Sequence, residues 1–316
     1  MPDWKPSASL DMLQKRATLL AAIRAFFVEK KVLEVDVPAL TATAVTDINI
    51  DSLQVGFSGR AGFDGCLITS PEFYMKRLLA AGSGDIYYLG HVFRVDESAA
   101  RHHREFTMLE WYRIGWNLDA LVQEVHDLVC GVIGCTEKTV RYTTYRQAFL
   151  EHAGIDPFCT TLAELKQCAQ EKLSPAFDTD ERAIWLDLLF SHLVEPQLQG
   201  LVFVTEFPAA QAALAQTKID EYGNAVAARF ELYIDGVEIA NGYQEELCAE
   251  VLGQRFQQDQ KIRAQREQVV PEMDERFLAA MAAGLPACAG VALGVDRLLM
   301  VASGEKTIRA VVPFMV

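Results

Sequence analysis

Residues 87 to 113, YYLGHVFRVDESAARHHREFTMLEWYR, have two β-like ends around a charged middle. The pattern predicts a hairpin with a polar loop from about Asp96 to Glu105, with Arg94 at the loop mouth and Phe106 opening the return strand. A guanidinium is a planar, permanently charged fork that can grip a phosphate from two directions, and the ring of Phe106 could stack on a base. The alternative is an edge hairpin whose charges are only solvated.

A second segment, GVALGVDRLLM at residues 290 to 300, favours phosphate binding. The small residues Gly290, Ala292 and Gly294 would let a ligand approach the backbone. Arg297, at the start of the following helix, would supply a second phosphate-binding fork. Alone, this strand-to-helix junction is weak evidence, because glycine-rich junctions occur in many folds.

A third segment, RFELYIDGVEIANGY at residues 229 to 243, predicts a hairpin whose Asp235-Gly236 turn favours a type I′ connection. Glu231 and Glu238 would face each other across its strands and could hold a hard cation such as Mg²⁺. A purely structural pair of glutamates would instead need a hidden cationic partner. Two arginines, two carboxylates and an aromatic ring together suit a magnesium nucleotide.

The elements that must position these residues follow from periodicity and turn signals. Ser9 is a plausible N-cap for a helix over residues 10 to 31, and VLEVDVPAL at residues 32 to 40 predicts a strand that ends at Pro38. Residues 201 to 208 predict a short buried strand, residues 254 to 283 a helix broken at Pro271, and residues 288 to 302 a strand that runs into a helix. Hairpins beside helices indicate an α+β fold with a mainly antiparallel sheet.

Composition bounds the function classes. The chain has 316 residues, 51% of them hydrophobic, which is enough for one sizeable core, and we expect one continuous domain. No apolar run reaches the ~20 residues that cross a bilayer, and the N-terminus has no apolar signal core, so we expect a cytoplasmic protein. The seven cysteines form no CxxC pair, which favours reduced thiols over a zinc site.

Net charge argues against a nucleic-acid binder. With 29 basic and 43 acidic side chains the net charge is −14, which opposes attraction to a phosphate backbone. A dedicated tRNA or DNA binder is therefore disfavoured, although a local basic patch can overcome an acidic whole.

The motifs resemble a known family. VLEVDVPAL, then FRVDE with RHHREFTMLE, then GVALGVDR resemble the three signature motifs of class II aminoacyl-tRNA synthetases. TSPEFYMKRLL, FTMLEWY and VEIANGYQEEL are similar to the lysyl-tRNA synthetase branch, and the resemblance runs from about residue 10 to residue 312. It implies an α+β catalytic domain, a mainly antiparallel sheet flanked by helices, and the use of ATP and Mg²⁺.

The chain starts at the helix before the first motif. We therefore expect a single catalytic domain over residues 1 to 316, without the OB-fold domain of about 100 residues that reads the anticodon. In this the chain resembles the stand-alone paralogues that ligate (R)-β-lysine to a lysine of translation elongation factor P. The resemblance implies (R)-β-lysine and translation elongation factor P as partners, and it disfavours tRNA.

The same resemblance implies roles for ATP binding. Arg94 would grip the α-phosphate, and Phe106 and Arg297 would sandwich the adenine, with Arg297 also near the γ-phosphate. Asp96 and His102 would help to orient ATP, although Asp96 stands where the family usually has a glutamate, one methylene longer.

It also implies a metal site and an amino-acid site. Glu231 and Glu238 would carry Mg²⁺. The residues for the amino acid are Glu72 and Glu110 at its amino group, Asn241 at its carboxylate, Glu245 at its distal ammonium, and Tyr112 and Tyr243 along the pocket. An acidic cluster of this kind suits a diamine.

Two departures from lysyl-tRNA synthetases concern the substrate. Ala292 stands where those enzymes usually have glycine and Ser70 where they usually have alanine, so the pocket floor gains a methyl and a hydroxyl. We hypothesise that this change disfavours α-lysine and accepts a chain whose amino group lies one carbon further along; such differences discriminate by about 1 to 3 kcal/mol.

Assembly and acceptor binding are implied more loosely. The first motif, ending in Pro38, resembles the part that builds the dimer interface of the family, which predicts a C₂ homodimer. The basic loop over residues 101 to 104 could contact an acidic protein or only ATP.

Three rival functions share parts of this pattern. A truncated lysyl-tRNA synthetase that activates α-lysine would have to bind tRNA despite the acidic balance. A small-molecule ligase that releases the acyl group to ammonia does not need a lysine-like pocket. A catalytically inactive regulatory paralogue would typically have lost an ATP-binding arginine, whereas Arg94 and Arg297 are both present.

Overall fold

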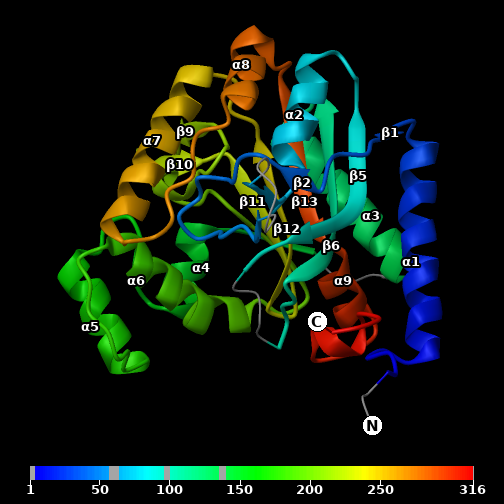
Figure 1. Cartoon of the computed structure of the whole chain (residues 1–316). Helices are drawn as coiled ribbons and strands as arrows, with labels where there is room; N and C mark the ends of the chain where they lie inside the picture. The colour runs from blue at the N-terminus through cyan, green and yellow to red at the C-terminus, as the bar shows by residue number, and fades with distance from the viewer. Residues whose placement is uncertain (1–3, 57–63, 96–99, 135–139, 316) are drawn as a thin grey trace. The chain divides into compact units, whose positions relative to one another are not determined.

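The computed structural model describes residues 4–56, 64–95, 100–134 and 140–315, and its contacts divide the chain into two compact units (Figure 1). The first unit is formed by Met1–Cys135 together with Glu245–Val316, and the second by Thr136–Gln244. Within the described part of the chain, no helix is both long enough and apolar enough to cross a membrane.

The main sheet of the first unit is mostly antiparallel. β1 pairs with β5 in parallel, whereas β5 with β6 and β6 with β13 pair antiparallel, in the order β1-β5-β6-β13. A smaller antiparallel sheet has the order β2-β4-β3. These strands are β1 (Leu33–Glu34), β2 (Leu40–Thr41), β3 (Gln54–Gly56), β4 (Asp64–Leu67), β5 (Ile86–Phe93), β6 (Glu105–Ile114) and β13 (Cys288–Gly294).

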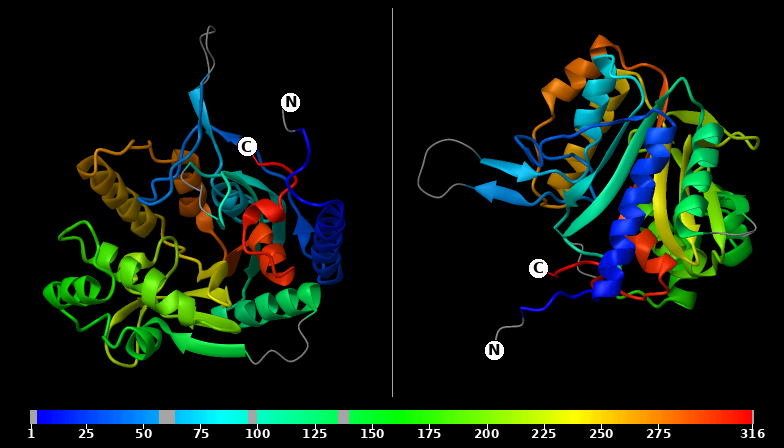
Figure 2. Two further views of the ribbon diagram at one scale, coloured as in Figure 1. Left: turned by 90° about the horizontal axis from the view of Figure 1, so that it is seen from below. Right: turned by 90° about the vertical axis from the view of Figure 1, so that its right-hand side faces the viewer.

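Helices cover one face of the main sheet, where α1 runs beside the strands (Figure 2). Phe27 of α1 stacks on Tyr87 of β5, with ring centroids 4.4 Å apart, and its centroid lies 5.4 Å from that of Trp111 in β6. The indole N–H of Trp111 donates to a carboxylate oxygen of Glu124 in α3 at 3.0 Å. The helices of the first unit are α1 (Leu10–Glu29), α2 (Glu72–Ala80), α3 (Leu118–Ile133), α7 (Ala249–Gln265), α8 (Glu275–Gly284), α9 (Val295–Ala302) and a short turn η4 (Ile308–Ala310).

The opposite face of the sheet carries the chemistry. Successive side chains of a strand alternate between its two faces. In β6, Leu109 and Trp111 lie on the helix-covered face, so Phe106, Glu110 and Tyr112 lie on the other face. Near this face α2 packs against α8, where Phe73 stacks on Phe277 with centroids 4.2 Å apart. The helix α2 is thereby held firmly enough to present charged side chains toward the sheet.

The second unit is built on another mostly antiparallel set of strands. β7 and β8 are parallel, β8 and β11 antiparallel, and β11 and β12 antiparallel, while β9 and β10 form a separate hairpin. Its elements are β7 (Val140–Thr144), α4 (Tyr145–His152), α5 (Leu162–Lys172), α6 (Arg182–Leu189), η1 (Phe190–Val194), η2 (Glu195–Gln197), β8 (Leu201–Thr205), η3 (Ala209–Gln211), β9 (Thr217–Ile219), β10 (Ala225–Ala227), β11 (Arg229–Ile234) and β12 (Val237–Gln244).

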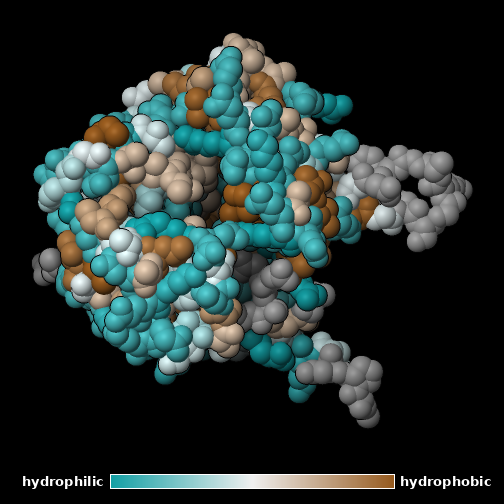
Figure 3. Space-filling view, turned by 90° about the vertical axis from the view of Figure 1, so that its left-hand side faces the viewer, coloured by the Kyte–Doolittle hydropathy of each residue, from teal (hydrophilic) through white to brown (hydrophobic). Residues whose placement is uncertain are grey.

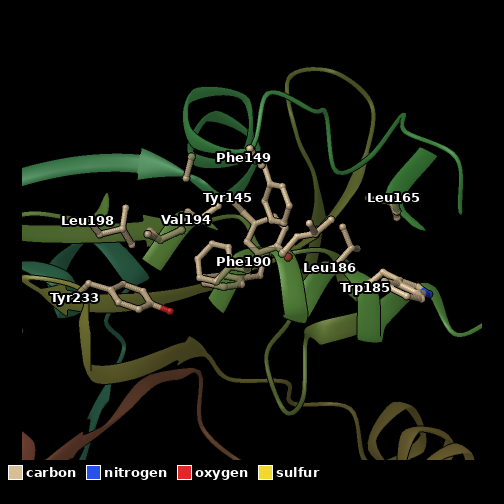
Figure 4. Packing of buried hydrophobic residues seen from close by; sticks show 14 of the residues in the cluster. Tyr145, Phe149, Leu165, Trp185, Leu186, Phe190, Val194, Leu198 and Tyr233 are labelled. Atoms are coloured by element: carbon tan, nitrogen blue, oxygen red, sulfur yellow. The ribbon is translucent and has the colours of Figure 1, made fainter. Parts of the chain in front are cut away.

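An aromatic cluster forms the core of the second unit (Figure 4). Tyr145 of α4 stacks on Phe190 of the π-helical turn η1 with centroids 4.9 Å apart, and Phe190 contacts Phe149 and Phe207. Tyr233 of β11 belongs to the same buried cluster. This packing fixes β11 from one side and so fixes the hairpin that carries Glu231 and Glu238.

Most predicted elements are confirmed. Ser9 caps α1, since its Oγ accepts a hydrogen bond from the N–H of Met12 at 3.1 Å. The β11-β12 turn has Asp235 and Gly236 at φ 49° and 73°, as a type I′ connection requires. The break at Pro271 is confirmed but wider, because α7 ends at Gln265 and α8 begins at Glu275. The α+β, mainly antiparallel fold is likewise confirmed.

One predicted strand is much shorter than expected. Of VLEVDVPAL, Leu33–Glu34 pairs as β1 and Leu40 begins β2, whereas residues 35 to 38 belong to no strand. The physical reason is that β1 lies at the edge of its sheet order beside β5, so alternation of apolar residues there does not require a long pairing.

The face drawn in Figure 3 is mainly hydrophilic, with hydrophobic residues in separate patches. The cysteines in the described residues are free thiols, as predicted.

Candidate active site

Arg94 and Phe106 lie close together at the mouth of the β5-β6 hairpin. The backbone N–H of Arg94, directly after β5, donates to the carbonyl of Arg104 at 2.9 Å. Its guanidinium lies 5.3 Å from the ring centroid of Phe106, and its Nε donates to the carbonyl of Thr69 at 3.4 Å. The structure thus brings together the cation and the ring that the sequence assigned to a nucleotide.

The rest of the loop is described in part. Asp96 lies outside the described residues. His102 is half-buried, and its neighbour His103 is buried, with Nδ1 2.5 Å from the carbonyl oxygen of Glu105. Of the two histidines, the one chosen from the sequence is therefore the more accessible.

Arg297 is carried by a helix that is tied to the strand of Phe106. It is the third residue of α9, which follows β13 directly. The buried Asp296 accepts a hydrogen bond from the N–H of Thr107 at 2.7 Å and pairs with Arg16 of α1. Arg16 and Asp296 were missed from the sequence, although they fix the helix turn that presents Arg297.

A buried carboxylate occupies the centre of the open sheet face. Glu110 of β6 lies opposite Tyr88 of β5 and Ala292 of β13, and only 3% of it is exposed. The hydroxyl of Tyr112 donates to Glu110 Oε1 at 2.8 Å. Phe106 and Glu110 lie four residues apart on the same strand, which corresponds to about 13 Å. The register between β6 and β13 places Ala292 beside Glu110, as the pocket-floor hypothesis requires.

Two further predicted carboxylates meet at one lysine. Glu72 is the first residue of α2, where its N–H donates to Ser70 Oγ at 3.4 Å, and Glu245 follows β12. The Nζ of Lys76, one helical turn after Glu72, lies 2.7 Å from Glu72 Oε1 and 2.6 Å from Glu245 Oε2. We call Glu72, Lys76, Glu110, Tyr112 and Glu245 the acidic pocket; all five lie in the first unit.

Burial and mutual repulsion change the proton affinities in the acidic pocket. Burial, followed by the charge of Glu72, raises the pKa of Glu110 well above its usual range, while the Tyr112 hydroxyl opposes the shift. Burial raises the pKa of Glu245 to about 7, against the attraction of Lys76. A group of carboxyls held in this way binds protons until a cationic ligand replaces them.

The backbone of β13 is as close to this pocket as a glycine allows. A Cβ at Gly290 would lie 2.5 Å from Oε1 of Glu245 and would collide with the Tyr112 ring. The predicted small residue is thus needed for the approach of two pocket side chains to the strand.

The hairpin of the second unit carries the two glutamates of the predicted metal site, in a different arrangement from the one expected. Glu231 lies opposite Asn241, and Glu238 lies opposite Tyr233, because the register shifts between Leu232 and Tyr233. The two carboxylates are therefore diagonal neighbours. They share the face of Tyr233, and the β-bulge brings Asn241 and Tyr243 onto the same face.

Glu231 also has the cationic partner that a structural pair would need. Arg229 and the Tyr233 hydroxyl both bond to its carboxylate. Burial raises the pKa of Glu231, Arg229 opposes this, and the nearby Glu238 raises it further. Among the described residues no group of three or more His, Cys, Asp or Glu side chains forms a metal cluster. Mg²⁺ is usually held by one or two carboxylates together with substrate phosphates, so the pair still fits it.

Asn241 and Tyr243 lie on the same strand face as Glu231. The amide of Asn241 donates to the Tyr243 hydroxyl at 3.1 Å and accepts from Nε of Arg229 at 3.1 Å. Arg229 was missed from the sequence, because an arginine at the first residue of a hairpin is expected to be exposed to solvent. It organises three of the residues that the sequence did identify.

The comparisons with known proteins agree with the motifs. A family model described as tRNA synthetases class II (D, K and N) matches residues 3–316. A protein of Pectobacterium carotovorum subsp. carotovorum (strain PC1) named elongation factor P–(R)-β-lysine ligase is 45% identical, over 99% of this chain and 97% of that protein. Proteins of the same name from Salmonella typhi and Histophilus somni (strain 2336) are 43% identical, over 99% and 98% of this chain and 97% of each relative. The resemblance drawn from the motifs is confirmed.

Proposed function

Because the chain belongs to the class II tRNA synthetase family of the D, K and N type, and is similar over nearly its whole length to proteins named for this activity, we propose that it is an ATP-dependent elongation factor P–(R)-β-lysine ligase. It would activate (R)-β-lysine as an acyl-adenylate and join it to a lysine side chain of translation elongation factor P. We place this reaction in the cytoplasm.

The observation that carries the proposal is the acidic pocket. The buried carboxyls of Glu110 and Glu245 and the partly buried carboxyl of Glu72, 16% exposed, lie around one buried ammonium, that of Lys76. Fully ionised, they leave a net charge of −2, which a substrate with two ammonium groups would neutralise. Buried charges are stable only when paired, so such a pocket favours a diamine over a neutral or singly charged side chain.

In the first step the carboxylate of (R)-β-lysine attacks the α-phosphorus of ATP. A bond forms between a carboxylate oxygen and phosphorus, the bond to the bridging oxygen breaks, and pyrophosphate leaves with the electron pair. Arg94 would stabilise the charge on the α-phosphate oxygens, with Phe106 and Arg297 holding the adenine and Asp96 and His102 orienting ATP. No protein nucleophile is needed.

Glu231 and Glu238 would hold Mg²⁺ during this step. When bound, the ion neutralises charge on the phosphates. Arg229 would keep Glu231 ionised and oriented, since it pairs with that carboxylate. Asn241 and Tyr243 would contact the substrate from the same hairpin.

In the second step the ε-amine of the acceptor lysine attacks the acyl carbon. A C–N bond forms, the C–O bond to AMP breaks, and the amine loses a proton, which the phosphate of the adenylate would accept. The free amine has an ordinary pKa of about 10.4, so this proton must be lost for attack.

Exchange of radiolabelled pyrophosphate into ATP tests the first step. We expect exchange that depends on the amino acid, with a higher kcat/KM for (R)-β-lysine than for α-lysine. Arg94→Ala should lower the rate at least about 100-fold, as loss of a group that stabilises the transition state does, with an unchanged circular dichroism spectrum. Exchange that is faster with α-lysine, or near-normal rates in Arg94→Ala, would contradict the proposal.

A further inference from the structure

Lys76 is a charged residue in the first unit whose side chain has no exposed surface. Its Nζ lies 2.7 Å from Glu72 Oε1, one turn earlier on α2, and 2.6 Å from Glu245 Oε2, which is distant in sequence. Lysine is rarely buried unless it is paired. Here both partners are residues to which the proposed function assigns the amino groups of the substrate.

The two carboxylates keep this ammonium charged. Burial lowers the pKa of Lys76, but the attraction of Glu245 and then of Glu72 outweighs it, so that the pKa lies above the usual range. Lys76 therefore remains a cation at every pH at which the enzyme would work, and it cannot serve as a base or a nucleophile.

The position of Lys76 determines what Glu72 and Glu245 can do. Each carboxylate has two oxygens, and Lys76 occupies Oε1 of Glu72 and Oε2 of Glu245. The other oxygen of Glu245, Oε1, is the one that approaches Gly290. The lysine thus holds two acids from different elements in one orientation.

Resting on the proposed function, we infer that Lys76 is a positioning residue for the amino-acid substrate: its buried ammonium orients Glu72 and Glu245 and sets the charge of the acidic pocket at the value that two substrate ammonium groups neutralise. Lys76 touches no reacting atom in this account. It acts through the two carboxylates.

Other titratable groups near the pocket support this charge count. Burial, with the charges of Asp36 and Glu110, raises the pKa of Tyr88, and burial raises the pKa of Cys288 to about 12, so both are neutral at pH 7. Tyr112 is neutral for the same reason. The groups that face the pocket from the elements around it are Glu72 and Lys76 on α2, Tyr88 on β5, Glu110 and Tyr112 on β6, Glu245 after β12, and Cys288 on β13. Asp85, before β5, also acts on Cys288, but its charge is balanced by its ion pair with Arg113.

Lys76→Met tests the inference, since methionine has a similar length and no charge. Without the ammonium, the pKa of Glu245 rises further, because a neighbouring cation no longer favours its ionised form. At about pH 7 we expect KM for (R)-β-lysine in pyrophosphate exchange to rise ~10- to 100-fold, with kcat changed much less. KM should recover toward the wild-type value as the pH is raised to about 8.5, where the carboxyls ionise again.

Lys15→Met is the matched control, because Lys15 also pairs with an acid one helical turn away, Asp11, but on the exposed surface of α1. It should leave KM and its pH dependence unchanged. Lys76→Arg retains the charge, and it should keep the wild-type pH dependence of KM even if the larger side chain raises KM itself. A loss in Lys76→Met that is equal at every pH would indicate a merely structural lysine and overturn the inference.

A measurement on the wild-type protein does not depend on whether the variants fold. Calorimetry of (R)-β-lysine binding at about pH 7, in two buffers of different ionisation enthalpy, counts protons exchanged on binding. Because Glu245 has a pKa of about 7 without ligand, two incoming ammonium groups should displace protons. Proton uptake on binding would overturn the charge count, because the carboxyls would then be neutral in the complex. A wild-type protein that neither binds nor activates the diamine would contradict the proposed function itself. Normal wild-type activity together with an unaffected Lys76→Met variant would contradict only the inference about Lys76.

Discussion

At the scale of single residues, the proposed function requires a buried carboxyl that can ionise and bind a cation. Glu110 is held by the Tyr112 hydroxyl at 2.8 Å, which lowers a pKa that burial and Glu72 raise. Three acids from three elements would repel each other without such donors and without Lys76. The repulsion between these acids lowers the stability of the fold, and a bound cationic ligand would remove that repulsion. Such a destabilising cluster is typical of a functional site.

Tyr112→Phe should therefore shift the pH dependence of the reaction. Losing the donor raises the pKa of Glu110 further, so a higher pH is needed to ionise it and bind an ammonium group. A hydrogen bond to a charged group is worth about 1.5 to 3 kcal/mol, which predicts a rise in KM of ~10- to 100-fold near neutral pH. The check is kcat/KM for (R)-β-lysine as a function of pH, whose rising limb should move to higher pH.

Tyr74→Phe is a suitable control, because Tyr74 lies on α2 and its hydroxyl donates to Thr41 Oγ1 at 3.2 Å. The assigned role of Glu110 would be contradicted if the rising limb of kcat/KM against pH stayed in place in Tyr112→Phe, or if it moved equally in both variants.

At the scale of elements, the close approach of β13 to the acidic pocket makes Gly290 sensitive. In Gly290→Ala the methyl group would collide with Tyr112 and lie 2.5 Å from Glu245 Oε1. Overpacking of this kind costs about 1 to 3 kcal/mol, and the displaced side chains should also raise KM. Urea unfolding and pyrophosphate exchange measure the two effects.

Gly131→Ala provides the contrast within the same unit. Gly131 lies in α3 with open space where a Cβ would be, and alanine is favoured over glycine in a helix by about 1 kcal/mol. It should be neutral or stabilising. A Gly290→Ala variant as stable and as active as the wild type would show that the pocket is not packed as described.

Local signals were sufficient for the elements that hold the chemistry. The cap at Ser9, the Asp235-Gly236 turn and the β5-β6 hairpin follow from short-range rules that burial elsewhere does not override. The β-bulge after Leu232 could not be predicted, because strand alternation presumes an unbroken ladder. Continued from the turn, such a ladder gives Glu238 its observed partner Tyr233 but gives Glu231 the wrong partner.

Two of the missed residues, Lys76 and Arg16, share one physical cause. Lys76 and Arg16 read as solvated positions of amphipathic helices, and their burial depends on partners far away in sequence, Glu245 and Asp296. A single sequence carries no signal for such a pair. The positions of the acids follow from the family resemblance, whereas the contact of Lys76 with Glu245 appears only in the folded structure.

At the scale of the whole molecule, large apolar side chains remain exposed on the N-terminal elements of the first unit. Val28 of α1 is 70% exposed and Leu33 of β1 is 55% exposed. We expect a C₂ homodimer that covers this region. Light scattering should give twice the chain mass, and Val28→Glu with Leu33→Glu should give a monomer, because buried glutamates would oppose association. A wild-type monomer at micromolar concentration would contradict the expectation.

The net charge of −14 also bears on the acceptor, since it opposes binding to a polyanion such as tRNA. A protein acceptor carries no such uniform phosphate charge, and the acyl-adenylate can be attacked by any amine that reaches it. The acceptor is therefore the point at which this chain should differ in function from the tRNA-charging members of its family.

The most direct measurement is an incubation with ATP and Mg²⁺, (R)-β-lysine or α-lysine, and either elongation factor P or total tRNA, read by intact mass. We predict that elongation factor P gains the mass of one lysyl residue with (R)-β-lysine and that tRNA is not acylated with either amino acid. Acylated tRNA beside unmodified elongation factor P would contradict the account.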